Sequence, residues 1–188
     1  YPDYHCAPVD AFGDESARLL IVGLAPGLHG ANRTGRPFTG DASGELLFAT
    51  LYGAGFSSSD RAEADGDLLQ LFNARITNAV RCLPPENKPT AAELKRCARY
   101  LKDDIDRLPR PAVIVALGKQ AHDSILRVLD LRLNAFPFAH GAEHEPAEGL
   151  VLIDSYHCSR YNTQTRRLTA DMFSAVFQRA KTCLEQGS

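Results

Sequence analysis

A glycine-rich segment with one aromatic ring and several polar side chains is the part of this sequence best suited to chemistry. It reads GLAPGLHGANRTGRPFTGD and covers residues 23 to 41. Asn32, Arg33 and Arg36 precede its single phenylalanine, Phe38. Backbone amides can approach a ligand closely where Cβ atoms are absent, and a phenyl ring can stack on a flat molecule. We therefore expect this segment to bind a planar ligand.

Other interpretations of the same glycines remain open. Neither GxGxxG nor GxxxxGK[ST] occurs in the segment, so the lysine of a phosphate-binding loop is absent. An Ω loop whose glycines only form turns is a further alternative. Long ordered connections are often functional, which favours the ligand-binding interpretation. Asp41, at the end of the segment, also suits the N-cap position of a following helix.

Four short apolar runs are the elements that must position this segment. They have the length and β-branched content of buried strands and cover residues 17–24, 74–80, 112–118 and 150–157. Helical patterns occur at residues 43–55, 90–108, 119–130 and 169–186. Alternating strands and helices predict a single-domain three-layer α/β/α sandwich with a central, mainly parallel four-stranded sheet. Ligands of such sheets bind beyond the carboxyl ends of the strands.

Length, charge and cysteine content narrow the class of protein. A chain of 188 residues is most simply one domain covering residues 1–188. The net charge of −2 excludes a broadly basic surface, so any contact with nucleic acid must come from a local patch. Five cysteines without a CxxC pair favour a reducing compartment, and we expect a cytoplasmic monomer without membrane segments. Because the first residue is Tyr1, we expect an N-terminal segment to be missing upstream.

Three motifs carry a resemblance to a known family. GLAPGLHGANRTGRPFTGDASG, RCLPPENKPT and SYHCSRYNTQTRRLT follow three of the predicted strands. Together they resemble the uracil-DNA glycosylase superfamily, and most closely its family 5, from about Phe12 to the C-terminus. The resemblance implies base-excision repair: removal of uracil, and of other deaminated bases such as hypoxanthine, from DNA. The reaction is hydrolysis of the N-glycosidic bond, and it leaves an abasic site.

The resemblance also implies the catalytic residues. His157 matches the histidine of the second motif, where an imidazole can donate to uracil O2 as negative charge develops on the leaving base. Other branches place an acid or amide where this chain has Leu24, which cannot orient water. Asp41 is then the acid expected to orient water or stabilise the sugar cation, and Asn87 is the second polar candidate. A helix cap for Asp41 and a turn residue for Asn87 are the alternatives.

A second set of matched positions is implied to hold the flipped base. Its members lie in the first motif or at the end of the second strand: Gly23, Ala25, Gly27, Phe38 and Asn78. The carboxamide of Asn78 can both donate and accept along a pyrimidine edge, although a satisfied buried Asn is the alternative. Family 5 members carry Ala at this position, so Asn78 predicts a tighter preference for uracil than the family label implies.

DNA contacts are expected near the first and third motifs. In the third motif, Arg160 and Tyr161 are large enough to fill the stack that a flipped base vacates. The expected DNA-binding set is Arg33, Arg36, Arg160, Tyr161, Asn162 and Arg166. Such residues would form a local basic rim on an acidic protein, whereas an ordinary solvated surface is the alternative.

Cys82 and Cys97 correspond to two of the four cysteines that bind a [4Fe–4S] cluster in families 4 and 5. Thiolates are the ligands such clusters use. The other pair in the family lies upstream of the region around Phe12, so we expect no intact four-cysteine site from this chain alone. A non-catalytic nucleic-acid binder of the same fold is the alternative function, and Leu24 is the residue that supports it.

Overall fold

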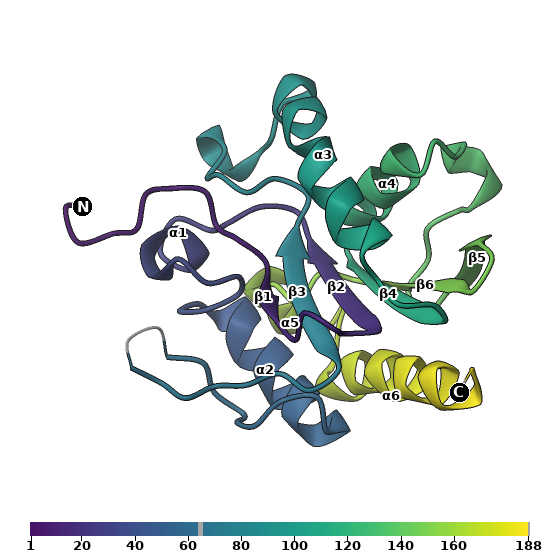
Figure 1. Cartoon of the computed structure of the whole chain (residues 1–188). Helices are drawn as coiled ribbons and strands as arrows, with labels where there is room; N and C mark the ends of the chain where they lie inside the picture. Colours follow the sequence, from purple (N-terminus) through teal and green to yellow (C-terminus); the bar gives the residue numbers. More distant parts are fainter. Residues whose placement is uncertain (64–65, 188) are drawn as a thin grey trace.

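One mixed sheet of six strands lies at the centre of the computed structural model, which describes residues 1–63 and 66–187. The strand order is β1-β3-β2-β4-β6-β5 (Figure 1). The inner strands are β2 (Leu19–Gly23), β3 (Ala74–Asn78), β4 (Ala112–Leu117) and β6 (Leu150–Ser155), and they are mutually parallel. Each lies within one of the four predicted runs, so the predicted parallel sheet is confirmed.

The predicted number of strands was too low. Two short edge strands, β1 (Phe12–Gly13) and β5 (Glu143–Ala147), pair antiparallel with β3 and β6. The first has only two residues, and the second reads EHEPA without an apolar residue that points to a core. Edge strands are held by backbone hydrogen bonds to one neighbour, so their side chains need not follow a buried pattern.

Both faces of the sheet are covered by helices. In Figure 1, α3 (Ala91–Asp106) and α4 (Lys119–Val128) lie above the sheet, and α2 (Ala42–Ala54) and α6 (Ala170–Gln186) lie below it. This arrangement confirms the predicted α/β/α sandwich. The long helices begin and end within a few residues of the predicted bounds, and the capping box of Thr90 and Glu93 is formed at the start of α3.

Alternate residues of β2 belong to opposite layers of the core. Leu19 and Ile21 pack in the cluster that includes α2 and α6, whereas Leu20 and Val22 pack with α3 and α4. All four side chains are fully buried. Because neither face meets water, the strand reads as a continuous apolar run rather than an alternating one.

Short helices occur inside the connections predicted as irregular. They are α1 (Ala31–Thr34), η1 (Pro85–Asn87), η2 (Leu133–Ala135) and α5 (Arg160–Gln164). The N-terminal residues run along α1, where the amides of His5 and Cys6 donate to the carbonyls of Arg33 and Asn32 at 3.1 Å each. In the described part of the chain, no helix is long and apolar enough to cross a membrane.

Candidate active site

A cavity of about 700 Å³ opens where the segments that follow β2, β3 and β6 meet. It lies beyond the carboxyl ends of parallel strands, as predicted for this type of sheet. Predicted site residues that line it are Ala25, Gly27, Phe38, Asp41, Asn78, Asn87 and His157. The structure therefore brings all three predicted catalytic residues and most of the predicted base-binding residues into one cavity.

Two glycines of the first motif make room for the functional side chains. A Cβ atom on Gly23 would lie 2.4 Å from Asn78 Oδ1 and 2.6 Å from Phe38 Cζ. A Cβ atom on Gly30 would lie 2.2 Å from Asp41 Oδ2. No real Cβ contact is so short, so these positions exclude every larger residue unless the site residues move. The bare backbone thus serves close packing around the site.

Phe38 forms one wall of the cavity. Its backbone has a φ of 54°, an uncommon conformation for a bulky residue, and its side chain is only 8% exposed. The ring centroid lies 6.0 Å from that of His157, with an interplanar angle of 32°. The ring also packs into the core cluster of the α2 and α6 layer. Both interpretations of Phe38, core aromatic and stacking surface, are therefore compatible with its position.

Asn78 holds a buried acceptor without a partner. Its side chain is 4% exposed, and Oδ1 accepts no hydrogen bond from any residue in the described ranges. Leaving such a group unpaired costs about 1–3 kcal/mol. A ligand in the cavity that donates a hydrogen bond to Oδ1 would remove this cost. The alternative of a satisfied structural Asn does not fit this geometry.

Asp41 has two roles through its two oxygens. Oδ1 accepts a hydrogen bond from the amide of Gly44 at 3.1 Å and caps α2. Oδ2 lies against Gly27 and Gly30, at the lining of the cavity. The cap therefore fixes the carboxylate without consuming the oxygen that faces the first motif. The predicted cap is confirmed, and it is compatible with a catalytic role.

Burial lowers the pKa of His157, and the charge of Asp41 opposes this effect only in part. The imidazole is therefore neutral at neutral pH, since desolvation disfavours its charged form. The loop that carries it is fixed by Asn162, whose Nδ2 donates to the His157 carbonyl at 2.9 Å. The next residue, Cys158, is buried, and burial raises its pKa to about 12. Its thiol stays protonated and cannot act as a nucleophile at neutral pH.

Arg36 and Asn162, two residues of the predicted DNA-binding set, have hydrogen-bond partners within the protein. Both guanidinium Nη atoms of Arg36 bind the Asp67 carboxylate, at 2.6 and 3.0 Å, and Nη2 also donates to the Glu63 carbonyl. Arg36 thus anchors the first motif to the segment before β3. Asn162 is engaged with the His157 carbonyl. Sequence alone could not supply the partner of Arg36, because Asp67 lies 31 positions away.

Four members of the predicted DNA-binding set lie on the surface. Arg33 is exposed, and its Nε donates to the His29 carbonyl at 2.8 Å. Arg160 and Arg166 are exposed in and just after α5, and the side chain of Tyr161 is 72% exposed. A large aromatic that projects from a short helix beside the cavity suits a wedge between bases.

His29 lines the cavity and was not among the predicted site residues. Its Nδ1 forms a hydrogen bond of 2.8 Å with the hydroxyl of Tyr4, and its side chain is exposed at the cavity. The signal was present in the sequence, since His29 is the only histidine among the glycines of the first motif. Its contact with Tyr4 depends on the path of the N-terminal residues and was not predictable.

The two cysteines predicted as cluster ligands lie away from the cavity lining. Cys82 is exposed after β3, Cys97 is half-buried in α3, and neither forms a disulfide. In the described residues, no group of three or more metal-binding side chains includes either thiol. Two thiolates fit half of the ligand set of a [4Fe–4S] cluster and cannot hold one by themselves.

The fold and the cavity define an α/β/α protein with an open cavity at the carboxyl edge of its sheet. Residues 11–181 match the family described as "Uracil DNA glycosylase superfamily". The chain belongs to this superfamily, which confirms the family predicted from the three motifs.

Relatives agree with this assignment. The chain is 51% identical over 178 residues to "Type-5 uracil-DNA glycosylase" of Thermus thermophilus, covering 95% of this chain and 81% of that protein. It is 41% identical to the type-5 enzyme of Pyrobaculum aerophilum, covering 94% and 76% of the two chains. The crystal structure of SMUG2 from Pedobacter heparinus is similar in fold, with a TM-score of 0.55, 15% identity, and coverage of 90% and 76%.

Proposed function

We propose that this chain is a monofunctional uracil-DNA glycosylase that hydrolyses the N-glycosidic bond of deoxyuridine in DNA and leaves an abasic site. The observation that carries the proposal is the unpaired, buried Oδ1 of Asn78 beside the ring of Phe38. A uracil base presents an N3–H donor on its edge and a flat face for stacking. A cavity with both complements can hold a base only after the nucleotide has left the duplex.

His157 acts on the leaving base in this proposal. Its imidazole is neutral because burial lowers its pKa, so a ring N–H can donate to uracil O2 without transferring a full charge. Negative charge grows on the base as the glycosidic bond breaks. A fixed donor at that atom stabilises the transition state more than the ground state.

Asp41 acts on the sugar side of the bond. Its capping hydrogen bond to Gly44 holds the carboxylate in place, and Oδ2 remains at the cavity. A carboxylate here can orient the attacking water or stabilise the oxocarbenium-like sugar. Asn87, exposed at the cavity rim in η1, is the second polar group for the same water. Leu24 lines the cavity without a polar atom.

The DNA duplex is proposed to meet the protein around α5 and the first motif. Tyr161 and Arg160 would fill the vacated stack, and Arg33 and Arg166 would contact phosphates. Asn78 further leads us to propose a preference for uracil over hypoxanthine and other deaminated bases, because the carboxamide pattern complements a pyrimidine edge.

We also propose that Cys82 and Cys97 supply two of the four thiolates of a [4Fe–4S] cluster. The chemistry of these donors supports the assignment, since soft thiolates are the ligands of such clusters. Bound there, the cluster would have a structural role, because neither cysteine lines the cavity. No step of the proposed reaction involves it.

The proposal is tested with a labelled oligonucleotide that contains one uracil. After incubation with the protein, hot alkali breaks the strand at every abasic site. We expect breaks at the uracil position, and none in a matched oligonucleotide with thymine at that position. Retained DNA binding without strand breaks would instead support the alternative, a non-catalytic binder of the same fold.

A further inference from the structure

The residue directly before His157 is held by a histidine from another segment. The amide of Tyr156 donates to Nδ1 of His140 at 3.0 Å. The two rings are stacked, with centroids 4.9 Å apart and an interplanar angle of 28°. His140 lies in the connection before β5, so the contact joins two segments that are far from adjacent in sequence. His140 does not line the cavity and cannot contact the base directly.

The Tyr156 peptide is fixed on both sides. Its carbonyl accepts a hydrogen bond from Ser155 Oγ at 2.8 Å, and its amide is bound by His140. The guanidinium of Arg167 lies 4.6 Å from the centre of the Tyr156 ring. The chain therefore leaves β6 in one defined direction, and His157 is the next residue along it.

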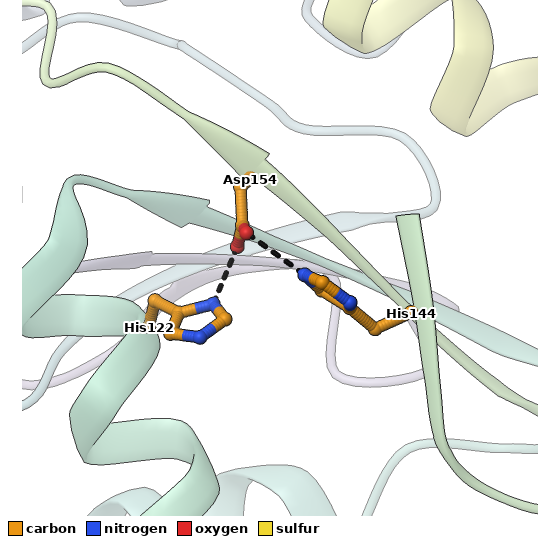
Figure 2. Close-up of side chains that lie close together, drawn as sticks. All are labelled: His122, His144 and Asp154. Atoms are coloured by element: carbon orange, nitrogen blue, oxygen red, sulfur yellow. Dashed lines mark hydrogen bonds and ion pairs between the residues drawn. The ribbon is translucent and has the colours of Figure 1, made fainter. Parts of the chain in front are cut away.

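Two positions before Tyr156, Asp154 forms a cluster with two histidines, shown in Figure 2. The Asp154 carboxylate binds His122 Nδ1 at 2.6 Å and His144 Nε2 at 3.0 Å. His122 Nε2 lies 2.8 Å from the carbonyl of Phe136, so both of its nitrogens face acceptors. Burial lowers the pKa of His122, but the hydrogen bond and charge of Asp154 outweigh burial and raise it overall. The cluster is held by hydrogen bonds, because its separations are those of N–H···O bonds rather than of ligands around a metal.

The backbone of Asp154 ties this cluster to the segment that carries His140. Its amide donates to the carbonyl of Ala142 at 2.9 Å, and its carbonyl accepts from the amide of Gly141 at 2.8 Å. His140 is therefore held beside β6 by its neighbours, independently of its own ring. What the ring adds is the hydrogen bond to Tyr156.

We propose that His140 is a positioning residue for His157: its unprotonated Nδ1 holds the Tyr156 amide, and protonation of His140 releases that amide and misplaces the catalytic imidazole. This inference rests on the proposed function of His157. An amide N–H can bind Nδ1 only while that nitrogen carries a lone pair. A displacement of about 1 Å in a reacting group is enough to lower a rate by about 10²-fold.

The surroundings of His140 keep it neutral near pH 7. Burial lowers its pKa, and a hydrogen bond to the backbone of Met172 in α6 opposes this in part. The Tyr156 phenol ring faces it, with Arg167 packed on the same Tyr156 ring. The carboxylate of Asp154 on β6 is engaged by His122 and His144. Protonation of His140 therefore has a desolvation cost. It occurs at a pH below the ordinary pKa of a histidine.

The test compares two variants of one side chain. In His140→Asn, Oδ1 replaces the Nδ1 acceptor and does not titrate; in His140→Gln, the amide oxygen reaches the position of Nε2 instead. Single-turnover excision of uracil is measured from pH 5 to pH 8.5. We expect His140→Asn to stay within about threefold of the unmodified protein at pH 8 and His140→Gln to lose about tenfold or more. At the acidic end of this pH range, we expect His140→Asn to keep the excision rate that the unmodified protein loses.

A second measurement does not depend on activity. Amide hydrogen exchange, followed by NMR, reports the protection of the Tyr156 N–H directly. We expect protection at pH 8 in the unmodified protein and in His140→Asn, and its loss in His140→Gln. Equal protection of the Tyr156 N–H and equal excision rates in the two variants would overturn the inference. It would also be overturned if the excision rate of His140→Asn fell at acidic pH as it does in the unmodified protein. If the unmodified protein released no uracil, the proposed function would fail, while hydrogen exchange would still test the contact.

Discussion

At the scale of single residues, Asn78 and Asp41 show how one side chain meets a structural and a chemical requirement. Asn78 ends β3 with its acceptor oxygen buried and unpaired within the described ranges. Asp41 caps α2 with one oxygen and presents the other to the cavity. In each case the fold fixes a polar side chain that lines the cavity.

Replacing Asn78 with Ala removes the acceptor that complements the uracil edge. We expect single-turnover excision of uracil to fall about 10²-fold or more, because a site built to hydrogen-bond its substrate discriminates strongly through that bond. Excision of hypoxanthine should change less, so the preference for uracil is lost. Asn134→Ala, at an exposed position in η2, is the matched control. An unchanged ratio of uracil to hypoxanthine rates in Asn78→Ala would contradict this assignment.

Asp41 can be separated into its two roles by two substitutions. Asp41→Asn keeps an N-capping oxygen and loses the charge, so stability should change by less than about 0.5 kcal/mol while the single-turnover rate falls. Asp41→Ala should lose the rate and, in addition, about 1 kcal/mol of unfolding free energy. Thr169→Ala removes the cap of α6 alone and should lower stability without slowing excision. Denaturant unfolding measures the stability of each variant, and single-turnover kinetics measure its excision rate. A full excision rate in Asp41→Asn would refute the catalytic role of Asp41.

At the scale of elements, the first motif acts as a packed wall whose shape depends on missing side chains. Gly23 and Gly30 each leave a gap that a site residue fills. The motif is also bound from outside, since Arg36 joins it to Asp67 with Nη–Oδ separations of 2.6 and 3.0 Å. These contacts act together with the hydrogen bonds of α1 and the cap of α2, which hold other parts of the cavity lining.

Gly30→Ala tests the packing of this wall. The new Cβ would lie 2.2 Å from Asp41 Oδ2, so the carboxylate must move and the excision rate should fall. Gly53→Ala is the matched control, because a Cβ there meets nothing within 4 Å. It lies in α2, where Ala is favoured over Gly by about 0.5–1 kcal/mol. Equal excision rates in the two variants would show that the close approach of Gly30 to Asp41 is not required.

The ion pair between Arg36 and Asp67 predicts a dependence of stability on pH. Burial alone would raise the pKa of Asp67, but the hydrogen bond and charge of Arg36 and a backbone amide lower it overall. A lowered pKa in the folded state stabilises the protein above the unfolded pKa of about 4, and this contribution is lost as the pH falls through the folded value. Asp67→Asn should therefore cost about 1 kcal/mol at pH 7 and progressively less below pH 4. Urea unfolding at pH 7 and below pH 4 measures the difference in unfolding free energy between the variant and the unmodified protein. The same difference at both pH values would contradict a stabilising ion pair.

At the scale of the whole molecule, the parts that the sequence predicted are those whose pattern comes from burial on both sides. β2 and β4 are continuous apolar runs because helices cover both faces, and the start of α3 carries its capping box in adjacent residues. β5 was missed because it is an exposed, polar edge strand held by backbone pairing. Its five residues carry no periodic apolar signal.

The site residues that could be predicted are those whose place follows from the order of strands in the sheet. His157 follows β6 and Asn78 is the last residue of β3, where the topology alone brings side chains together. The ion pair of Arg36 could not be predicted, because its partner, Asp67, lies 31 positions away and is brought to it only by the fold. The contact between His140 and Tyr156 is likewise absent from any local pattern, since the two residues are 16 positions apart.

Whole-molecule charge leads to a prediction about DNA affinity. With a net charge of −2, the protein must attract DNA through a local patch, for which Arg33 and Arg166 are exposed. The double variant Arg33→Ala, Arg166→Ala should bind DNA more weakly. The slope of log affinity against log salt should become shallower by about one for each phosphate that the protein no longer neutralises. The excision rate at saturating DNA should change much less. An unaltered slope of log affinity against log salt would show that these arginines do not contact the DNA.

The central claim, that the cavity removes uracil from DNA, is tested most directly by measuring the released base. The protein is incubated with an oligonucleotide containing a single uracil, and free uracil is quantified by mass spectrometry together with the mass of the remaining strand. The account predicts one free uracil per strand and a strand of unchanged length that has lost one base. An intact strand, with no free uracil after prolonged incubation at saturating protein, would contradict it.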